Sequence, residues 1–378
     1  MLKVMTIVGT RPELVKMSRV IAELDRRMQH VLVHTGQNYD YELNQVFFED
    51  LEIRKPDYFL EAAGENAAQT IAQVIQKADA VMEQEQPDAV LLYGDTNSCL
   101  AVIAAKRRKI PVFHMEAGNR CFDQRVPEEL NRKVLDHLSD INLVLTEHAR
   151  RYLIAEGIRP ETIIKTGSHM REVIDYYLPK ISASDVVARL SLQVGKFFLV
   201  SVHREENVDS SAALCDFMES LNALATQYNL PILVSTHPRT RKRLEEIGLS
   251  AMDKRINFSK PFGFLDYIKL QMEAFCVLSD SGTITEETSL LNLCAITLRN
   301  AHERPEGMDV GTLIMSGLKK ERVLQAVEMV TAQYKKGTRA TLPVADYENP
   351  HVSTQVVRVV TSYVDYINRV VWSKPDAK

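Results

Sequence analysis

Short apolar runs alternate with segments of helical periodicity along almost the whole chain, and this alternation limits the fold more than any other feature. In Glu13–Arg27, apolar residues recur at spacings of three and four, which is typical of an amphipathic helix. Strands that are apolar throughout and alternate with helices lie in a parallel sheet covered on both faces. The first series of predicted strands is Lys3–Val8, Val31–Thr35, Ala89–Tyr93, Val112–Met115 and Leu143–Thr146, with predicted helices at Glu13–Arg27, Ala67–Gln84 and Ser98–Lys109.

The same pattern begins again in the second half. A chain of 378 residues also exceeds the usual size of one domain. We therefore predict an α/β fold with two Rossmann-like, doubly wound domains, residues 1–170 and 171–352, that face a cleft, and a helix in 353–378 that crosses back to the first domain. The second series of predicted strands is Phe197–Val202, Ile232–Thr236 and Val277–Leu278, with predicted helices at Ala212–Tyr228, Pro238–Ile247, Phe264–Ala274, Thr285–Leu293 and Ser353–Val371.

Composition excludes several classes of protein. Lys and Arg number 46 against 50 Asp and Glu, a net charge of −4, and no long basic run occurs, so a general nucleic-acid surface is not expected. The five cysteines are widely spaced and form no C-x-x-C pair, which argues against a zinc site or a disulfide framework. Met1 leads directly into a predicted strand, and no apolar run approaches the ~18–20 residues of a membrane span. We expect a cytoplasmic protein with reduced thiols and no bound metal.

The first predicted strand is followed by Gly9–Glu13, at the sheet edge where open α/β folds bind ligands. Gly9 permits a tight turn, and Pro12 suits a first helical position. The helix end and Arg11, with Lys16 one turn later, would hold an anion. An ordinary strand-to-helix turn with an exposed Arg is the alternative. The segment matches neither G-x-G-x-x-G nor G-x-x-x-x-G-K-[ST], which disfavours NAD and P-loop ATP chemistry.

Acidic residues follow the next strands. Asp95 and Glu116 each stand at the carboxyl end of a predicted strand, and Glu128 and Glu129 open a helix. Asp95 could simply cap the helix after it, and a helix dipole favours acids in the first turn. These explanations do not account for four carboxylates on one edge, which are instead typical of a site that transfers protons.

Polar residues also follow the strands of the second half. His203 and His237 occupy equivalent places after two successive strands, and apolar neighbours already fill the inward positions beside His203. Ser281–Thr283 links a strand to a helix whose free N–H groups suit a diphosphate. Glu287, one turn further, could accept both hydroxyls of a ribose; an acid favoured by the helix dipole is the alternative.

These motifs, taken together, resemble those of a known family. The matching segments are Gly9–Glu13, Gly94–Thr96, His114–Gly118, Pro127–Arg132, His203–Glu205, Asp280–Glu287 and Glu303–Glu306. In order and spacing they are similar to the non-hydrolysing UDP-N-acetylglucosamine 2-epimerases, over roughly residues 3–360. The resemblance implies a GT-B-like fold, an isomerase without a cofactor, a UDP-linked 2-acetamido sugar as substrate, and a homodimer.

The implied chemistry explains why acid–base groups are needed. No carbonyl adjoins C2 of the sugar, so its hydrogen becomes removable only as the C1–O bond to UDP breaks. Loss of UDP and of the C2 proton gives a 2-acetamidoglycal. UDP then returns while a proton is delivered to the opposite face of C2. Arg, Lys and helix ends suffice to neutralise the phosphates without a metal.

The resemblance places Asp95, Glu116, Glu128 and His203 at the reacting centre. We assign Asp95 and Glu128 to proton transfer, and His203 to the diphosphate and the glycosidic oxygen. Glu116 transfers a proton or holds the sugar. The residues expected to bind UDP or the sugar are Arg11, Lys16, Arg132, His237, Ser281, Gly282, Thr283, Glu287 and Arg304.

Two segments, Thr35–Gln45 and Asn119–Val126, depart from the common family pattern, as does Thr283, where common members have Gly. Both segments look closer to the branch that converts UDP-2-acetamido-2,6-dideoxy-L-talose to UDP-N-acetyl-L-fucosamine for capsule and O-antigen synthesis. Apolar Phe122 and Val126 would tolerate the methyl group of a 6-deoxy sugar. The alternative is interconversion of UDP-N-acetylglucosamine and UDP-N-acetylmannosamine.

Three other functions remain as alternatives. A GT-B glycosyltransferase would need an acceptor site but no pair of C2 proton carriers. A hydrolysing 2-epimerase usually has a fused sugar kinase, which this sequence does not contain. A non-catalytic nucleotide-sugar-binding protein would not need the acid–base set.

Overall fold

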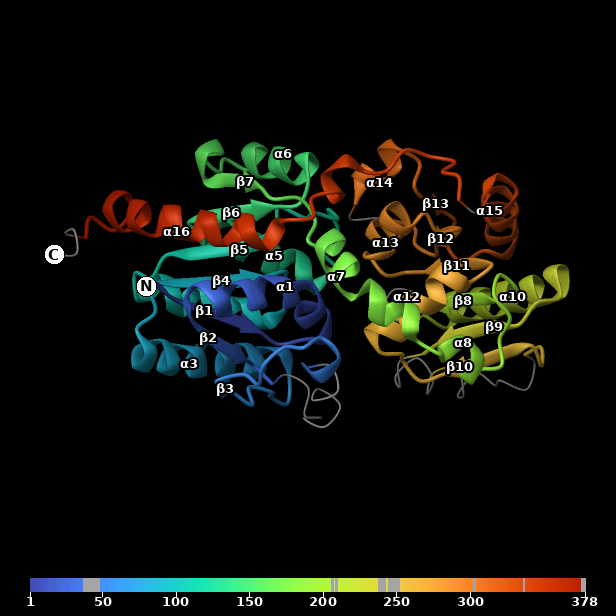
Figure 1. The fold of residues 1–378 in the computed structure, drawn as a ribbon, viewed down its shortest axis with the longest axis horizontal. Helices are drawn as coiled ribbons and strands as arrows, with labels where there is room; N and C mark the ends of the chain where they lie inside the picture. The colour runs from blue at the N-terminus through green and yellow to red at the C-terminus, as the bar shows by residue number, and fades with distance from the viewer. Residues whose placement is uncertain are drawn as a thin grey trace. The chain divides into compact units, whose positions relative to one another are not determined.

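Two separate parallel sheets organise the chain, each with its own helices (Figure 1). The computed structural model describes residues 1–36, 48–204, 207, 210–236, 243, 252–301, 304–335 and 337–374. Unit 1 comprises Met1–Asp175 and Asp346–Lys378, and unit 2 comprises Tyr176–Ala345.

Within the described residues, the sheet of unit 1 has seven parallel strands in the order β3-β2-β1-β4-β5-β6-β7. The order runs outward in both directions from the β1–β4 pair, as in doubly wound folds. The strands are β1 (Lys3–Val8), β2 (Gln29–His34), β3 (Tyr58–Phe59), β4 (Ala89–Tyr93), β5 (Val112–Ala117), β6 (Ile141–Val144) and β7 (Ile163–Lys165).

Helices connect these strands. The predicted helix Ser98–Lys109 begins instead as a 3₁₀ turn, η1, and continues as the short α4. The helical elements of unit 1 are α1 (Arg11–Arg27), α3 (Ala67–Glu85), η1 (Asn97–Ala101), α4 (Val102–Arg107), α5 (Pro127–Leu138), α6 (Glu147–Ala155), η2 (Pro160–Thr162), α7 (Met170–Ala183, which crosses into unit 2) and α16 (Val352–Val370).

Helix α1 shows how the sequence sets these elements. Glu13 accepts the backbone N–H groups of Gly9 and Thr10, and so satisfies donors that a helix start leaves unpaired. Its apolar residues lie on one buried face, and α16 packs against α1 with a matching row of buried valines (Figure 1). Helix α16, which follows unit 2 in the chain, thus belongs to unit 1.

Unit 2 repeats the architecture. Its six parallel strands, counted over the described residues, follow the order β10-β9-β8-β11-β12-β13. They are β8 (Phe198–Ser201), β9 (Ile232–Ser235), β10 (Ile256–Ser259), β11 (Cys276–Ser279), β12 (Ala295–Thr297) and β13 (Ile314–Met315). The helical elements are α8 (Val186–Arg189), α10 (Ser211–Tyr228), α12 (Phe264–Glu273), α13 (Ile284–Leu291), α14 (Pro305–Asp309) and α15 (Lys320–Gln333), with η4 (Ala345–Tyr347) at the return to unit 1.

Both faces of the unit 2 sheet are covered. Phe198 and Val200 of β8 contribute to a core under α10 and α15, whereas Phe197 and Leu199 belong to a second core with residues of α12 and α13. Alternate residues of a strand point to opposite faces, so a strand with two covered faces is apolar at every position. The predicted helix Pro238–Ile247 lies almost entirely outside the described residues.

The division into units differs slightly from the predicted domain boundaries. Residues 171–175 and 346–352, assigned to the second domain from the sequence, belong to unit 1. Residues 346–352 belong to unit 1 because Asp346 is bound to residues of that unit. Its carboxylate accepts from Lys165 Nζ at 2.7 Å and from the backbone N–H of Glu147 at 3.0 Å. Its carbonyl also accepts from Ser168 N at 3.0 Å.

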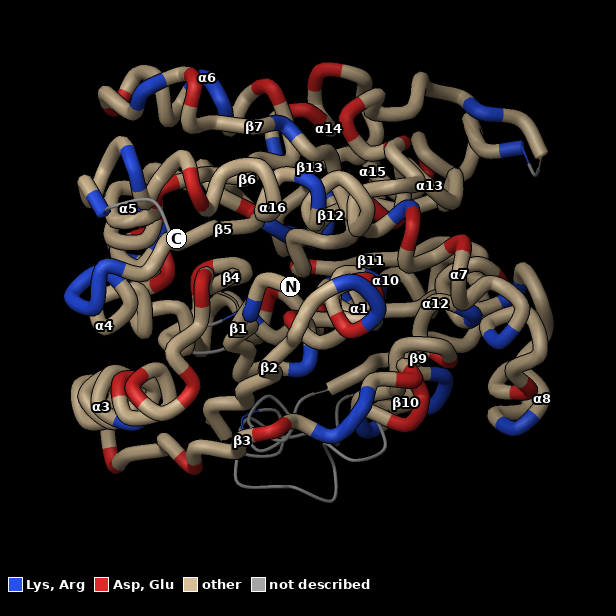
Figure 2. Tube along the Cα trace, turned by 60° about the vertical axis from the view of Figure 1, so that its left-hand side comes forward, with Lys and Arg blue, Asp and Glu red and all other residues tan. Residues whose placement is uncertain are grey.

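Charged residues of both signs occur on the helices and loops of both units (Figure 2). Among the described residues, no helix combines the length and apolarity needed to cross a membrane.

Candidate functional site

In unit 1, two predicted site segments follow the strands at which the sheet order reverses, β1 and β4. Open α/β sheets bind ligands at this point. The turn after β1 is tightly packed, since a Cβ on Gly9 would lie 1.8 Å from Ser98 Oγ and 2.3 Å from Thr35 Oγ1. Only glycine therefore allows the turn to approach so closely.

Glu116 has an unusual backbone. It lies in a β-bulge where the pairing of β5 with β6 shifts, and its φ is +63°. A non-glycine residue in this region costs on the order of 1–3 kcal/mol, and such residues cluster at functional sites. A bulge also redirects the side chain relative to the regular strand.

Among the described residues, Lys16, Tyr93 and Asn119 each donate to the Glu116 carboxylate. Lys16 Nζ lies 2.8 Å from Oε2, the Tyr93 hydroxyl donates to the same oxygen, and Asn119 Nδ2 lies 3.1 Å from Oε1. Hydrogen bonds and a cation favour the ionised form of a carboxyl group. Lys16, predicted to bind substrate, is therefore paired with Glu116 and largely buried.

Asp95 is held from α5. Arg132 Nε donates to Asp95 Oδ2 at 2.8 Å, and Asn131 Nδ2 donates to the Asp95 carbonyl at 2.9 Å. The same guanidinium binds Glu129 Oε2 at 2.9 Å. Arg132, predicted to bind substrate, thus joins two carboxylates near the carboxyl end of β4.

The two acids that open α5 differ in their surroundings. Glu129 is buried and accepts the backbone N–H groups of Cys121 and Phe122, both at 3.2 Å, so it fixes the loop before the helix. Glu128 is half-buried, and its carboxylate makes no hydrogen bond or ion pair to any other described residue. Of the two, Glu128 has the carboxylate suited to proton exchange with a ligand.

Glu13 is a titratable group of this site that the sequence analysis did not select. Burial raises its pKa to about 7, although the Thr96 hydroxyl and the N–H groups of Gly9 and Thr10 lower it, and the charge of Asp95 raises it further. The Thr-x-x-Glu spacing was a visible sign of a capping role. The burial of Glu13 beside Asp95 depends on a contact with Thr96, 83 positions away in the chain, and no feature of the sequence predicted it.

In unit 2 the strand order reverses between β8 and β11, and the residues that follow these strands contact each other. Asp280 accepts the backbone N–H groups of His203 and Arg204, and the side chain of Asn207. His203 Nδ1 lies 3.1 Å from Asp280 Oδ1. Burial raises the pKa of Asp280, but the bonds from His203, Arg204 and Asn207 together hold it below its ordinary value. Asp280 thereby orients the imidazole.

The predicted diphosphate turn joins β11 to α13. Ser281 Oγ and Thr283 Oγ1 lie 3.0 Å apart, and Gly282 lies between them. Glu287 is buried one turn into α13, where Gln271 Nε2 donates to its Oε2 at 2.6 Å. Gln271 was not anticipated from the sequence, because it lies on a different helix.

The remaining predicted binding residues are placed differently. Arg11 is the half-buried first residue of α1. Arg304 is almost fully buried and pairs with Glu286 at 2.9 Å, so its charge is already compensated within unit 2. His237 lies outside the described residues.

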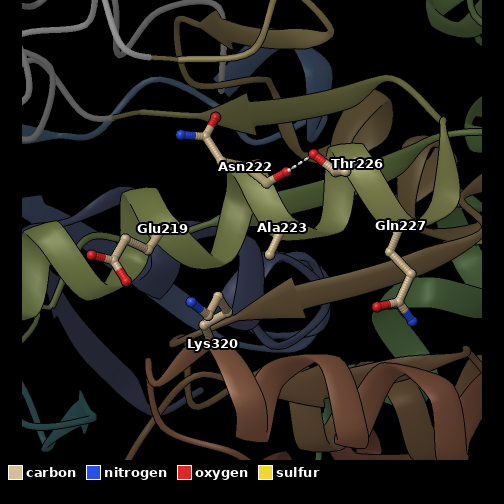
Figure 3. A pocket seen from close by; sticks show the side chains of 6 residues that line it. All are labelled: Glu219, Asn222, Ala223, Thr226, Gln227 and Lys320. Carbon is tan, nitrogen blue, oxygen red and sulfur yellow. Dashed lines mark hydrogen bonds between the residues drawn. The ribbon is translucent and has the colours of Figure 1, made fainter.

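A surface hollow of unit 2 contains none of the predicted site residues (Figure 3). It is lined by Glu219, Asn222, Ala223, Thr226 and Gln227 of α10 and by Lys320 of α15. Among the described residues, no group of three His, Cys, Asp or Glu side chains is arranged to hold a metal ion.

Comparison with known proteins identifies the chain as an isomerase with a GT-B-like fold of two parallel-sheet α/β domains, so the predicted fold class is confirmed. The chain belongs to the UDP-N-acetylglucosamine 2-epimerase family, whose model matches residues 22–361.

Three known proteins illustrate the likeness. The structure of UDP-N-acetylglucosamine 2-epimerase from Rickettsia bellii is 61% identical, with a TM-score of 0.94 over 99% of this chain and 100% of that one. A Methanocaldococcus jannaschii UDP-GlcNAc 2-epimerase in complex with UDP-GlcNAc and UDP is 33% identical, with a TM-score of 0.87 over 96% and 100%. A UDP-N-acetylglucosamine 2-epimerase of Methanococcus maripaludis is 36% identical over 87% of this chain and 91% of its own length.

Proposed function

We propose that this protein inverts C2 of a UDP-linked 2-acetamido sugar by eliminating UDP and adding it back. The main support is the group of carboxylates at the carboxyl edge of the unit 1 sheet. Asp95 follows β4 and Glu116 lies near the end of the adjacent β5, each 2.8 Å from a cation, and Glu128 lies in the first turn of α5. Membership of the epimerase family and the UDP-GlcNAc complex of a relative support the same reaction.

Each step of this reaction needs a specific group. In the elimination, a carboxylate takes the C2 proton, a C1–C2 double bond forms, and the electron pair of the C1–O bond leaves with UDP. In the return, a UDP oxygen forms the bond to C1, and a second acid protonates the opposite face of C2. We assign these transfers to Asp95 and Glu128. Glu116, whose ionised form is favoured by Lys16, Tyr93 and Asn119, stabilises positive charge on the sugar ring.

We assign the nucleotide to unit 2. Asp280 holds Nδ1 of His203, so Nε2 is available to the diphosphate and the glycosidic oxygen. Ser281, Gly282 and Thr283 offer hydroxyl and backbone donors to the phosphates. Glu287, oriented by Gln271, accepts the ribose hydroxyls.

Turnover in D₂O tests the reaction itself. Because the transferred proton exchanges with solvent at a carboxylate, the epimerised product should contain deuterium at C2, as measured by proton NMR. Product that retained its original C2 hydrogen completely would indicate an oxidation–reduction route and exclude elimination.

The same incubation distinguishes an epimerase from a glycosyltransferase. An epimerase needs only the UDP-sugar, whereas a glycosyltransferase would leave that sugar unchanged without an acceptor.

The ribose assignment has its own test. Glu287→Ala should weaken UDP affinity by about 1.5–3 kcal/mol, the usual strength of hydrogen bonds to a charged group, as measured by calorimetry. Glu219→Ala, in the surface hollow of the same unit, is the control and should bind UDP normally. Unchanged UDP affinity in a folded Glu287→Ala protein would place the ribose elsewhere.

For the sugar, we propose UDP-2-acetamido-2,6-dideoxy-L-talose, converted to UDP-N-acetyl-L-fucosamine. The loop before α5 supports this choice. Phe122, held through its N–H by Glu129, stacks edge-on against Tyr152 at 5.2 Å, and Val126 directly precedes α5. Apolar side chains in the loop before α5, the helix that carries Glu128, would suit a 6-methyl group better than a hydroxyl.

UDP-N-acetylglucosamine is the second candidate, since it is the sugar in the names of the relatives. An apolar wall rejects an added hydroxyl only moderately, so some activity on this sugar is expected. Comparison of kcat/KM for the two sugars decides between them. An equal or higher value for UDP-N-acetylglucosamine would refute the fucosamine assignment and leave the 2-epimerase reaction intact.

A further inference from the structure

We propose that Tyr93 is a positioning residue for Glu116, and that His169 acts on Glu116 through the Tyr93 hydroxyl. This inference rests on the proposed function, because it concerns a carboxylate assigned there to the reacting centre. It adds two residues, Tyr93 and His169, that belong to none of the sequence motifs matched above.

The geometry places the three side chains in a row. Tyr93 is the last residue of β4 and is 2% exposed, and its hydroxyl donates to Glu116 Oε2. On its other side the Tyr93 oxygen lies 3.2 Å from Nε2 of His169, which is fully buried just before α7. The two rings meet edge to face, with centroids 5.1 Å apart and planes at 87°.

The direction of the two hydrogen bonds follows from the charge of Glu116. An ionised carboxylate can only accept, so Tyr93 gives its single hydroxyl proton to Oε2. The phenolic oxygen can then only accept from His169, which must have its proton on Nε2. Each donor sets the orientation of the next, and the edge-to-face ring contact limits rotation of the imidazole.

Glu116 needs such support because two of its other donors, Lys16 and Asn119, constrain it less. Lys16 is a point charge on a flexible chain, and Asn119 lies in a loop three residues further along. The backbone of Glu116 is also in the left-handed region, where surrounding contacts must hold a non-glycine residue. Of the three donors, Tyr93 is the one fixed on a buried strand of the sheet.

The test begins with Tyr93→Phe, which removes one oxygen and keeps the ring. We expect kcat to fall roughly 10- to 100-fold, the range for losing a hydrogen bond to a charged group, while UDP affinity stays unchanged. Tyr58→Phe is the matched control, because the Tyr58 hydroxyl also donates to a glutamate, Glu85, at the far edge of the same sheet. Its kcat should equal that of the unmodified enzyme.

A double-mutant cycle tests the part played by His169. His169→Phe keeps a ring against Tyr93 but removes the donor, and should lower kcat several-fold. His169→Gln provides an amide donor in place of Nε2 and should retain more activity than His169→Phe. Because His169 acts through the hydroxyl, His169→Phe should have no further effect on kcat in a Tyr93→Phe background. Additive losses would show that the two residues act separately and refute the relay.

Glu116→Gln, measured in parallel, separates this inference from the proposed function. If Glu116→Gln is nearly inactive and folded Tyr93→Phe has normal kcat, Tyr93 does not position Glu116 and the inference is wrong. If Glu116→Gln keeps full activity, the role of Glu116 in the proposed function is wrong. Thermal unfolding confirms that each variant is folded. If Tyr93→Phe fails to fold, the two His169 variants still test the proposal. An equal kcat in His169→Phe and His169→Gln would overturn it.

Discussion

Asp95→Asn and Glu128→Gln should each lower kcat by roughly 10²-fold or more, because each keeps the shape of the side chain but can no longer exchange a proton. UDP affinity should remain largely unchanged, since we assign the nucleotide to unit 2. Steady-state kinetics with the UDP-sugar and calorimetry with UDP measure the two effects separately.

Asp79→Asn is a suitable control for these variants. It makes the same chemical change in unit 1, on α3, where Asp79 pairs with Arg108. Its kcat should not change. Near-normal kcat in both Asp95→Asn and Glu128→Gln would mean that other groups transfer the protons.

Asp136→Asn should destabilise the protein by about 3–5 kcal/mol, the usual effect of removing one partner of a buried ion pair. Asp136 lies 2.7 Å from the Arg120 guanidinium and 2.9 Å from His114 Nδ1, and the side chains of Asp136 and Arg120 are both 0% exposed. Loss of the carboxylate leaves Arg120 buried with Glu156 as its remaining acidic partner. Chemical denaturation measures the change in the free energy of unfolding.

A surface ion pair of the same length provides the comparison. Asp123 and Arg125 are also 2.7 Å apart, but the Arg125 side chain is 91% exposed. Water and salt screen such a pair, so Asp123→Asn should change stability little. Similar losses in both variants would show that burial is not the source of the Asp136 effect.

The fold class was predictable because its main signal is local. β1 and β4 have the bounds predicted from their apolar runs, Lys3–Val8 and Ala89–Tyr93, and α1, α3, α10 and α16 differ from prediction by one or two residues at their ends. The strands β3, β7, β10, β12 and β13 were not predicted, since two to four residues are too short to show a period.

The candidate site was predictable only in part. The carboxyl ends of parallel strands identified Asp95 and Glu116 as edge residues, but not their partners, since Lys16 and Glu116 are 100 positions apart. Tyr93 was missed for a different reason: an aromatic residue that ends an apolar strand looks like core. Nothing in the sequence distinguishes a buried hydroxyl that contacts a carboxylate from one that merely fills space.

The packing of α16 against α1 affects how the chain matures. Unit 1 is built from two segments, one before and one after unit 2, whereas unit 2 is one continuous stretch. On the ribosome, α1 is made before unit 2 and α16 is made after it. Unit 2 therefore emerges complete while α1 still lacks its contacts with α16, so of the two units, unit 1 begins to be made first but is completed last.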